Sequence, residues 1–123
     1  MKRMVNPVGG MASLGLMLAF GSAFGSEAMH SAGESVDVKL TEYKIEMPLS
    51  VAAGTKTFNV INTGVETHGF EVEGNGIEKA LKPRLKKGES GSLQVTLTPG
   101  TYKVYCPVFG HKSRGMTVDL IVK

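Results

Sequence analysis

Three side chains with reactive or metal-binding atoms lie close together near the end of the chain. Cys106, the only cysteine, is followed by His111 and then by Met116, at a C-x4-H-x4-M spacing. A thiol, an imidazole and a thioether at this spacing could bind a soft metal ion, could include a nucleophile with its base, or could be unrelated residues of one loop. The choice among these possibilities decides which class of function the sequence encodes.

A catalytic cysteine is the least supported possibility. It would need a base oriented by a third group and a site for an oxyanion, and the sequence offers no apparent Asn or Asp partner. Taken singly, Cys106 could be a buried structural residue and His111 an ordinary loop histidine. Taken together, a thiolate, an imidazole and a thioether are the soft donors that suit copper, and coordination would protect an unpaired thiol from oxidation. We therefore favour a copper site.

A trigonal copper site needs two imidazoles beside its thiolate, so a second histidine must come from elsewhere in the chain. His30 lies in MHSAGES, before any predicted strand. His68 follows the turn NTG and begins a predicted strand, where a scaffold can hold a ligand in place. We predict one copper ion with ligands from two connections, His68 from the first and Cys106, His111 and Met116 from the second.

Short β-strands must position these ligands. Apolar and polar residues alternate in segments such as VDVKL and TFNVIN, which is typical of strands with one buried face. Turn signals separate these segments, and no helical stripe appears from residue 34 onward. The segment 77–88 gives the least clear pattern, because Pro83 would interrupt a helix and the charges suit a solvated surface, and no strand is predicted there. We predict an all-β fold, an antiparallel Greek-key β-sandwich of seven or eight strands, including 36–40, 43–47, 57–62, 69–73, 92–97, 101–106 and 116–122.

The first 28 residues have the layout of a secretory signal peptide. Lys2 and Arg3 provide a positive start, an apolar run follows, and small residues offer cleavage sites between 23 and 28. A retained membrane anchor is the alternative, but the apolar run is shorter than the roughly 20 residues of a spanning helix. We predict a signal peptide at 1–28, one domain at 34–123 and a periplasmic or otherwise exported protein. Membrane association is expected only if the N-terminal segment is retained.

The charge balance gives little support to nucleic-acid binding. The chain carries 14 Lys and Arg against 11 Asp and Glu, and Lys2 and Arg3 belong to the predicted signal peptide. The remaining domain is therefore close to neutral, and it has no basic low-complexity tail. We expect no nucleic-acid partner.

Two sequence motifs surround the predicted ligands. The first is N-x-G-x-x-x-H-x-F, at Asn62, Gly64, His68 and Phe70, and the second is PGTYKVYCPVFGHKSRGM. Together they resemble the small blue-copper proteins, or cupredoxins, a family that includes plastocyanin, azurin, pseudoazurin and auracyanin. The resemblance extends from about residue 36 to the C-terminus, and the ligand spacing is similar to that of the auracyanin and azurin types.

The resemblance implies a role for each ligand. Cys106 would provide a thiolate with a short, highly covalent bond to copper, His68 and His111 would complete a trigonal plane, and Met116 would be a long axial ligand. It also implies one type 1 copper ion in an electron carrier that shuttles one electron between larger redox partners. A copper-binding or copper-delivery protein with the same fold is the alternative.

The resemblance further implies how partners meet the protein. In the family, the edge of the second histidine emerges through an apolar patch. Here Pro107, Val108 and Phe109 flank His111, so a redox donor and acceptor are expected to dock there on a monomer. We expect no enzyme, because copper oxidases need further histidines for a second copper centre and at least one more domain, and only His30 is left over.

Three residues depart from the family pattern. Many members have Asn directly after the first histidine, where its side chain ties the two ligand loops together, whereas this chain has Gly69. We expect Asn62 or Thr67 to make the tie, unless it is missing. Pro107 follows the cysteine directly and has no N–H. Thr67 stands where azurin has a glycine whose carbonyl approaches copper, so we do not expect a fifth, carbonyl ligand.

Overall fold

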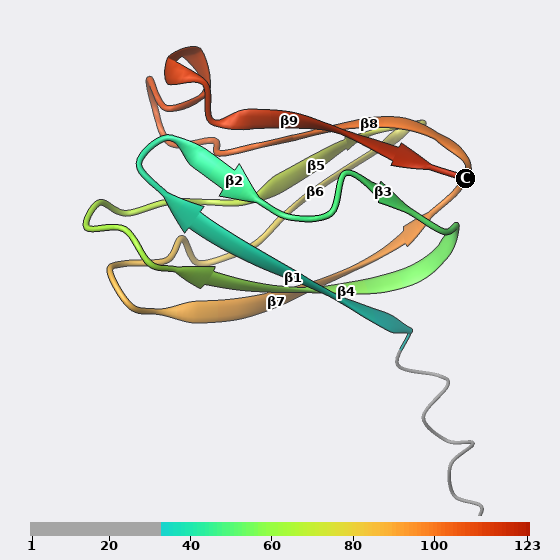
Figure 1. Cartoon of the computed structure of the whole chain (residues 1–123), viewed down its shortest axis with the longest axis horizontal. Helices are drawn as coiled ribbons and strands as arrows, with labels where there is room; N and C mark the ends of the chain where they lie inside the picture. The colour runs from blue at the N-terminus through green and yellow to red at the C-terminus, as the bar shows by residue number, and fades with distance from the viewer. Residues whose placement is uncertain (1–32) are drawn as a thin grey trace, which may run out of the picture. The chain divides into compact units, whose positions relative to one another are not determined.

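Nine strands and one short helix make up the part of the chain that the structure, a computed structural model, describes (Figure 1). This part is residues 33–123, so the predicted signal peptide and His30 lie outside it. The elements are β1 (Glu34–Thr41), β2 (Lys44–Glu46), β3 (Ser50–Val51), β4 (Gly54–Asn62), β5 (Glu71–Gly74), β6 (Ile77–Ala80), β7 (Ser90–Leu97), β8 (Gly100–Tyr105), the 3-10 helix η2 (Lys112–Arg114) and β9 (Thr117–Val122). Within the described residues, no helix is long and apolar enough to cross a membrane.

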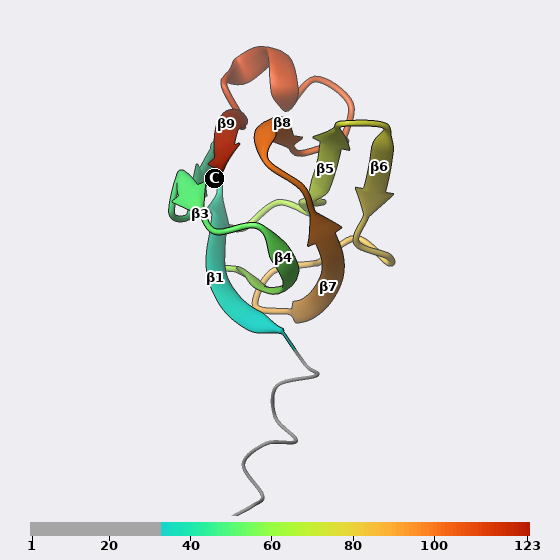
Figure 2. The same cartoon turned by 90° about the vertical axis from the view of Figure 1, so that its right-hand side faces the viewer.

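The strands form two sheets that face each other as a sandwich (Figure 1 and Figure 2). One sheet has the order β2-β1-β4-β7, and the other has the order β3-β9-β8-β5-β6. The predicted all-β sandwich is confirmed, with one refinement: β1 pairs with β4, and β3 with β9, in parallel. The other pairings are antiparallel. Alternation reports which face of a strand is buried and not the direction of its neighbour, so the sequence pattern cannot reveal the parallel pairs.

The apolar faces of the two sheets form the core. On β1, Val36, Val38 and Leu40 are buried, and the register sets Val38 opposite Val60 of β4. The second sheet contributes Tyr102, Val104 and other buried residues. Burial of each large apolar side chain stabilises the fold by about 1.5–3 kcal/mol. The apolar residues of the alternating pattern therefore face the core, and the polar residues between them face solvent.

Two short strands, β3 and β6, are not predicted from the sequence pattern. β3 has only two residues, too few for an alternation, and β6 lies in the segment 77–88 that the sequence assigns to no strand. β6 pairs with β5 across a turn at Asn75, which has a φ of 45°. It lies at the edge of its sheet and has no fully buried residue. An edge strand of this kind lacks the apolar alternation on which the prediction depends.

Three connections lie at the same end of the sandwich, at the left in Figure 1. They are the β1–β2 turn at 42–43, the β4–β5 connection at 63–70 and the β8–β9 connection at 106–116. The second connection is anchored by Phe70, whose ring packs against Phe58 in the core at a centroid distance of 5.4 Å. All four predicted ligands lie in the second and third connections.

Candidate metal centre

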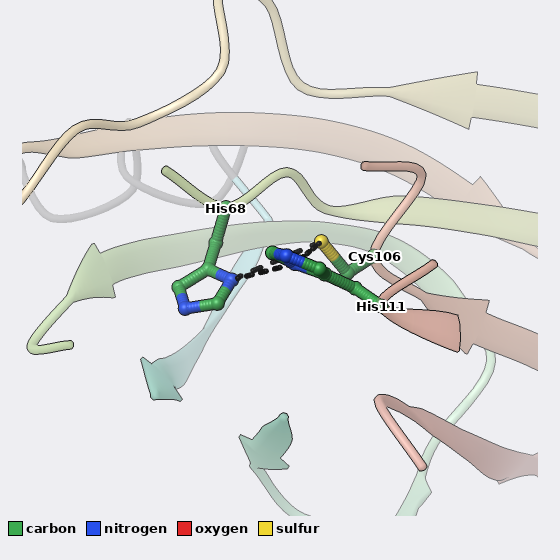
Figure 3. A group of neighbouring side chains, drawn as sticks. All are labelled: His68, Cys106 and His111. Atoms are coloured by element: carbon green, nitrogen blue, oxygen red, sulfur yellow. Dashed lines mark hydrogen bonds between the residues drawn. The ribbon is translucent and has the colours of Figure 1, made fainter. Parts of the chain in front are cut away.

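Three of the four predicted ligands, His68, Cys106 and His111, converge between the two connections (Figure 3). The Nδ1 atoms of the two imidazoles are 3.2 Å apart. The sulfur of Cys106 lies 3.5 Å from Nδ1 of His111 and 4.0 Å from Nδ1 of His68. All three side chains are buried. The fold thus brings together the two parts of the predicted site.

The spacing of these atoms fits one shared metal ion. Ligand atoms that bind one ion through bonds of about 2.0 Å to nitrogen and about 2.3 Å to sulfur lie about 3.3–3.8 Å apart, close to the observed separations. One thiolate and two imidazoles are the strong donors of a blue-copper site. The group therefore fits a type 1 copper site both in its donor types and in its spacing.

Asn62 organises the connection that carries His68. Its side-chain amide donates to the carbonyl oxygens of Glu66 at 2.7 Å and Leu85 at 2.9 Å, and its Oδ1 accepts from the N–H of Gly64 at 2.8 Å. The backbone of His68 donates to Leu85 at 2.9 Å and accepts from it at 2.8 Å. Asn62 therefore ties the first ligand loop to the segment around Leu85, and not to the second ligand loop.

One backbone group connects the two ligand loops, and others brace the second loop. The N–H of Gly69 donates to the sulfur of Cys106 at 3.3 Å, and this bond joins the loops where a side chain was expected to do so. The N–H of Cys106 donates to the carbonyl of Met116 at 3.1 Å, and the N–H of Met116 donates to the carbonyl of His111 at 3.2 Å. Met116 is thus buried beside the cysteine, and its part as an axial ligand stays a prediction.

Gly69 and Pro107, two of the departures from the family pattern, pack against each other. A Cβ atom at position 69 would lie 2.9 Å from Cδ and 3.0 Å from Cγ of Pro107, closer than carbon atoms pack without repulsion. The proline ring thus occupies the space that the usual Asn would need. Arg84 also holds Pro107, because its Nη2 donates to the proline carbonyl at 3.3 Å. The absence of a side chain at position 69 therefore makes room for the ring of Pro107.

Gly69→Ala should destabilise the protein by about 1–3 kcal/mol, because the new methyl group meets the ring of Pro107. Adding Pro107→Ala should recover most of this loss, since the change removes the ring. Urea unfolding of the two single variants and the double variant measures the coupling. Strictly additive effects would contradict the packing of these two residues.

Two glutamates that were not among the predicted site residues contact the histidines from outside. Nε2 of His68 lies 3.1 Å from Oε1 of Glu42, and Nε2 of His111 lies 3.1 Å from Oε1 of Glu66. Each imidazole therefore directs Nδ1 toward the centre and Nε2 toward a carboxylate. No motif marks these residues, and Glu42 is 26 positions away from its histidine.

Glu42 is also held by the backbone of the first ligand loop. Its Oε1 accepts from the N–H groups of Glu66 at 2.9 Å and Val65 at 2.8 Å. The hydrogen bond from Glu66 above all, helped by those from His68 and Val65, holds the pKa of Glu42 below its ordinary value against the opposing effect of desolvation. A Cβ atom at Gly64 would collide with this carboxylate. The glycine of the N-x-G motif thus leaves room for Glu42.

Tyr43 covers the outer edge of His111, with ring centroids 5.1 Å apart at an interplanar angle of 73°. Its hydroxyl donates to Oε2 of Glu66 at 2.9 Å and accepts from Nη1 of Arg114 at 3.1 Å. The hydrogen bond to Glu66 raises the pKa of Tyr43. Tyr43 has a φ of 97°, which bulky residues rarely adopt. Backbone strain of this kind is concentrated at functional sites.

Phe109 is the residue of the predicted docking patch that projects into solvent. It is 98% exposed, whereas Pro107 and Val108 are half-buried. His111 itself is only 7% exposed, and Glu66 lies on its outer nitrogen. Phe109 is therefore the most exposed apolar side chain of the predicted docking patch.

Solved structures resemble the chain over most of its length, whereas no family model and no curated protein sequence matches it. Auracyanin B is 22% identical, with a TM-score of 0.65 over 73% of this chain and 88% of its own. A variant of amicyanin is 29% identical, with a TM-score of 0.55 over 78% of this chain and 89% of its own. The chain has the cupredoxin fold.

The cupredoxin fold of this chain also matches part of a larger enzyme. A multicopper oxidase is 17% identical, with a TM-score of 0.57, and the match covers 72% of this chain but only 41% of that one. Residues 33–123 contain one group of His, Cys and acidic side chains arranged for a metal ion, the group at His68, Cys106 and His111. The described part of the chain therefore shares its fold with one portion of that oxidase and contains a single candidate metal centre.

Proposed function

We propose that this chain is an exported electron carrier that holds one type 1 copper ion through His68, Cys106, His111 and Met116. The observation that carries the proposal is the buried group of one sulfur and two imidazole nitrogens, 3.2–4.0 Å apart, in a cupredoxin fold. Copper bound by this donor set would supply a Cu(II)/Cu(I) couple. The protein would pass one electron at a time between larger redox partners and would not turn over a substrate.

The residues of the centre favour electron exchange because they hold the donor atoms in place. The N–H of Gly69 fixes the sulfur of Cys106, and carboxylates contact the outer nitrogens of both histidines. Preorganised donors and dipoles need little rearrangement when the charge of a site changes. The burial of the three side chains also keeps bulk water away from the thiolate.

Copper delivery, the alternative with the same fold, has less support. A delivery protein needs ligands that a partner can reach and exchange. His68 and Cys106 are fully buried, and His111 is nearly so. These ligands favour retention of the ion.

A redox titration of the copper-loaded protein tests the proposal. Visible absorption followed against applied potential should fit one reversible one-electron step, and copper should stay bound through repeated cycles beside an excess of chelator. A colourless protein that yields its copper to the chelator would support delivery. A coloured protein without a reversible step would refute electron transfer.

The proposed docking surface for redox partners is centred on Phe109, next to His111, Pro107 and Val108. Exposed aromatic rings often anchor protein interfaces. Phe109→Asp should slow electron exchange between oxidised and reduced copies of the protein by about tenfold, as for a loss of about 1.4 kcal/mol, and should leave thermal unfolding unchanged. Line broadening in NMR spectra measures this exchange. Leu49→Asp, which changes another exposed apolar residue, is the control, and equal slowing by both variants would contradict docking at Phe109.

The compartment and the assembly state are proposed from the sequence. Residues 1–28 have the layout of a cleavable signal peptide, so we place the protein in the periplasm or another exported compartment. Membrane association is part of the proposal only if this segment is retained. The protein would act as a monomer, without a nucleic-acid partner.

A further inference from the structure

Two carboxylates contact the histidines of the centre on the side away from the sulfur. In Figure 3, one ring nitrogen of His68 faces the other two residues and its second nitrogen points away. This outer nitrogen, and the outer nitrogen of His111, each lie 3.1 Å from a glutamate oxygen. We infer that Glu42 and Glu66 are positioning residues of the metal centre, which hold both imidazoles with Nδ1 toward the ion and lower its reduction potential. This inference rests on the proposed function.

The carboxylates determine which ring nitrogen carries the proton. An ionised carboxylate only accepts hydrogen bonds, so a neutral imidazole beside it carries its proton on Nε2. In both His68 and His111, Nδ1 is then left with a free lone pair. The two lone pairs face each other across 3.2 Å, next to the sulfur of Cys106. Two lone pairs and a sulfur this close together repel one another unless a metal ion or the thiol proton lies between them, so the outer carboxylates prepare the centre for a metal ion.

Glu42 is built into the first ligand loop. The same oxygen that meets His68 also accepts the N–H groups of Val65 and Glu66. The side chain of Glu42 is 27% exposed, and the missing Cβ of Gly64 leaves the space that it fills. Glu42 therefore orients one histidine directly and also shapes the loop that presents Glu66.

Glu66 uses both of its oxygens. Oε1 contacts His111, and Oε2 accepts a hydrogen bond from the hydroxyl of Tyr43. The same hydroxyl accepts a hydrogen bond from Arg114. The ring of Tyr43 also packs on the edge of His111. Two separate contacts thus fix the second imidazole, and the positive φ of Tyr43 is the backbone strain that accompanies them.

The two negative charges should also lower the Cu(II)/Cu(I) reduction potential of the ion. A carboxylate that accepts a hydrogen bond from a ligand imidazole raises the basicity of that ligand, and changes to such partners typically alter metal affinity by about 10–100-fold. The higher charge of Cu(II) makes it gain more from this basicity than Cu(I). Glutamine in place of glutamate keeps an oxygen that can accept the Nε2 proton and removes only the charge.

The test compares Glu66→Gln and Glu42→Gln with Glu46→Gln, which removes the same charge from an exposed position on β2. The reduction potential of each copper-loaded variant is measured by spectroelectrochemistry. Each site variant should weaken Cu(II) binding relative to Cu(I) by about tenfold, which for a one-electron couple is an increase of about 59 mV. Nitrogen NMR of the metal-free protein should show both histidines protonated at Nε2, with this preference weakened in the matching variant.

The outcomes separate this inference from the proposed function. If the wild-type protein forms no blue centre, the proposed function fails, and the metal-free NMR spectra still decide whether the carboxylates set the tautomers. If the blue centre forms but the site variants have the potential and tautomers of Glu46→Gln, the carboxylate inference alone is wrong. If Glu42→Gln does not fold, Glu66→Gln decides the matter, because the Glu66 side chain is 43% exposed and its loss leaves the bonds of Glu42 in place.

Discussion

Replacing Cys106 with serine should abolish the intense visible absorption of the copper-loaded protein. This absorption requires a thiolate bound to copper, and the sulfur of Cys106 is the only thiol sulfur in the chain. A serine hydroxyl is nearly the same size but remains protonated and is a poor ligand for copper. The sulfur accepts the N–H of Gly69 in the folded protein, and a hydroxyl oxygen can accept the same bond. The variant should therefore fold and lose its colour.

Circular dichroism and thermal unfolding of the metal-free proteins provide the control for this result. Similar spectra and unfolding temperatures for the wild type and Cys106→Ser would show that the sandwich is intact. A visible band of undiminished intensity in a folded Cys106→Ser variant would mean that the ligand assignment is wrong. A variant that binds copper without colour would agree with retention of the ion by His68 and His111 alone.

Replacing Asn62 with leucine should destabilise the protein by about 3 kcal/mol or more and should impair copper binding. The side chain makes three hydrogen bonds, with Glu66, Leu85 and Gly64, and is fully buried. Each buried polar group that loses its partner costs about 1–3 kcal/mol. The same bonds hold the loop that carries His68, so their loss should also displace this ligand.

Asn59→Leu is the matched control, because it makes the same change at an exposed position of the same strand. Urea unfolding gives the free energy of unfolding for both variants, and copper titration gives their affinities. Asn62→Leu should lower both quantities, and Asn59→Leu should change them little. Equal effects would mean that the hydrogen bonds of Asn62 do not stabilise the ligand loop.

The features that follow from the sequence depend on local patterns. The alternation in VDVKL and TFNVIN predicts β1 and β4 because each strand has one face in the core. The spacing of Cys106 and His111, together with the distant His68, predicts the group that the fold brings together. The strand pattern is visible within a few residues, and the ligands are recognisable from their residue types in two separate short segments, so the fold class and these candidate ligands could be predicted.

The features that the sequence does not reveal depend on contacts between loops. Glu42 and Glu66 look like ordinary surface acids until the β1–β2 turn and the two ligand loops are placed side by side. Gly69 lacks the side chain that would join the loops, but its own N–H joins them and Pro107 fills the space beside it. The parallel pairing of β1 with β4 is hidden for the same reason, since strand direction depends on the path of the intervening chain.

Addition of Cu(II) to the metal-free wild-type protein, followed by visible absorption and electron paramagnetic resonance, shows whether the chain forms a type 1 copper centre. We predict an intense band at about 600 nm that rises linearly to one equivalent of copper. Ascorbate should bleach the band and reoxidation should restore it, with the narrow copper hyperfine splitting of a covalent thiolate site. Weak absorption with the wide splitting of ordinary Cu(II), or saturation at a number of ions other than one, would contradict the assignment of a type 1 copper centre to His68, Cys106 and His111.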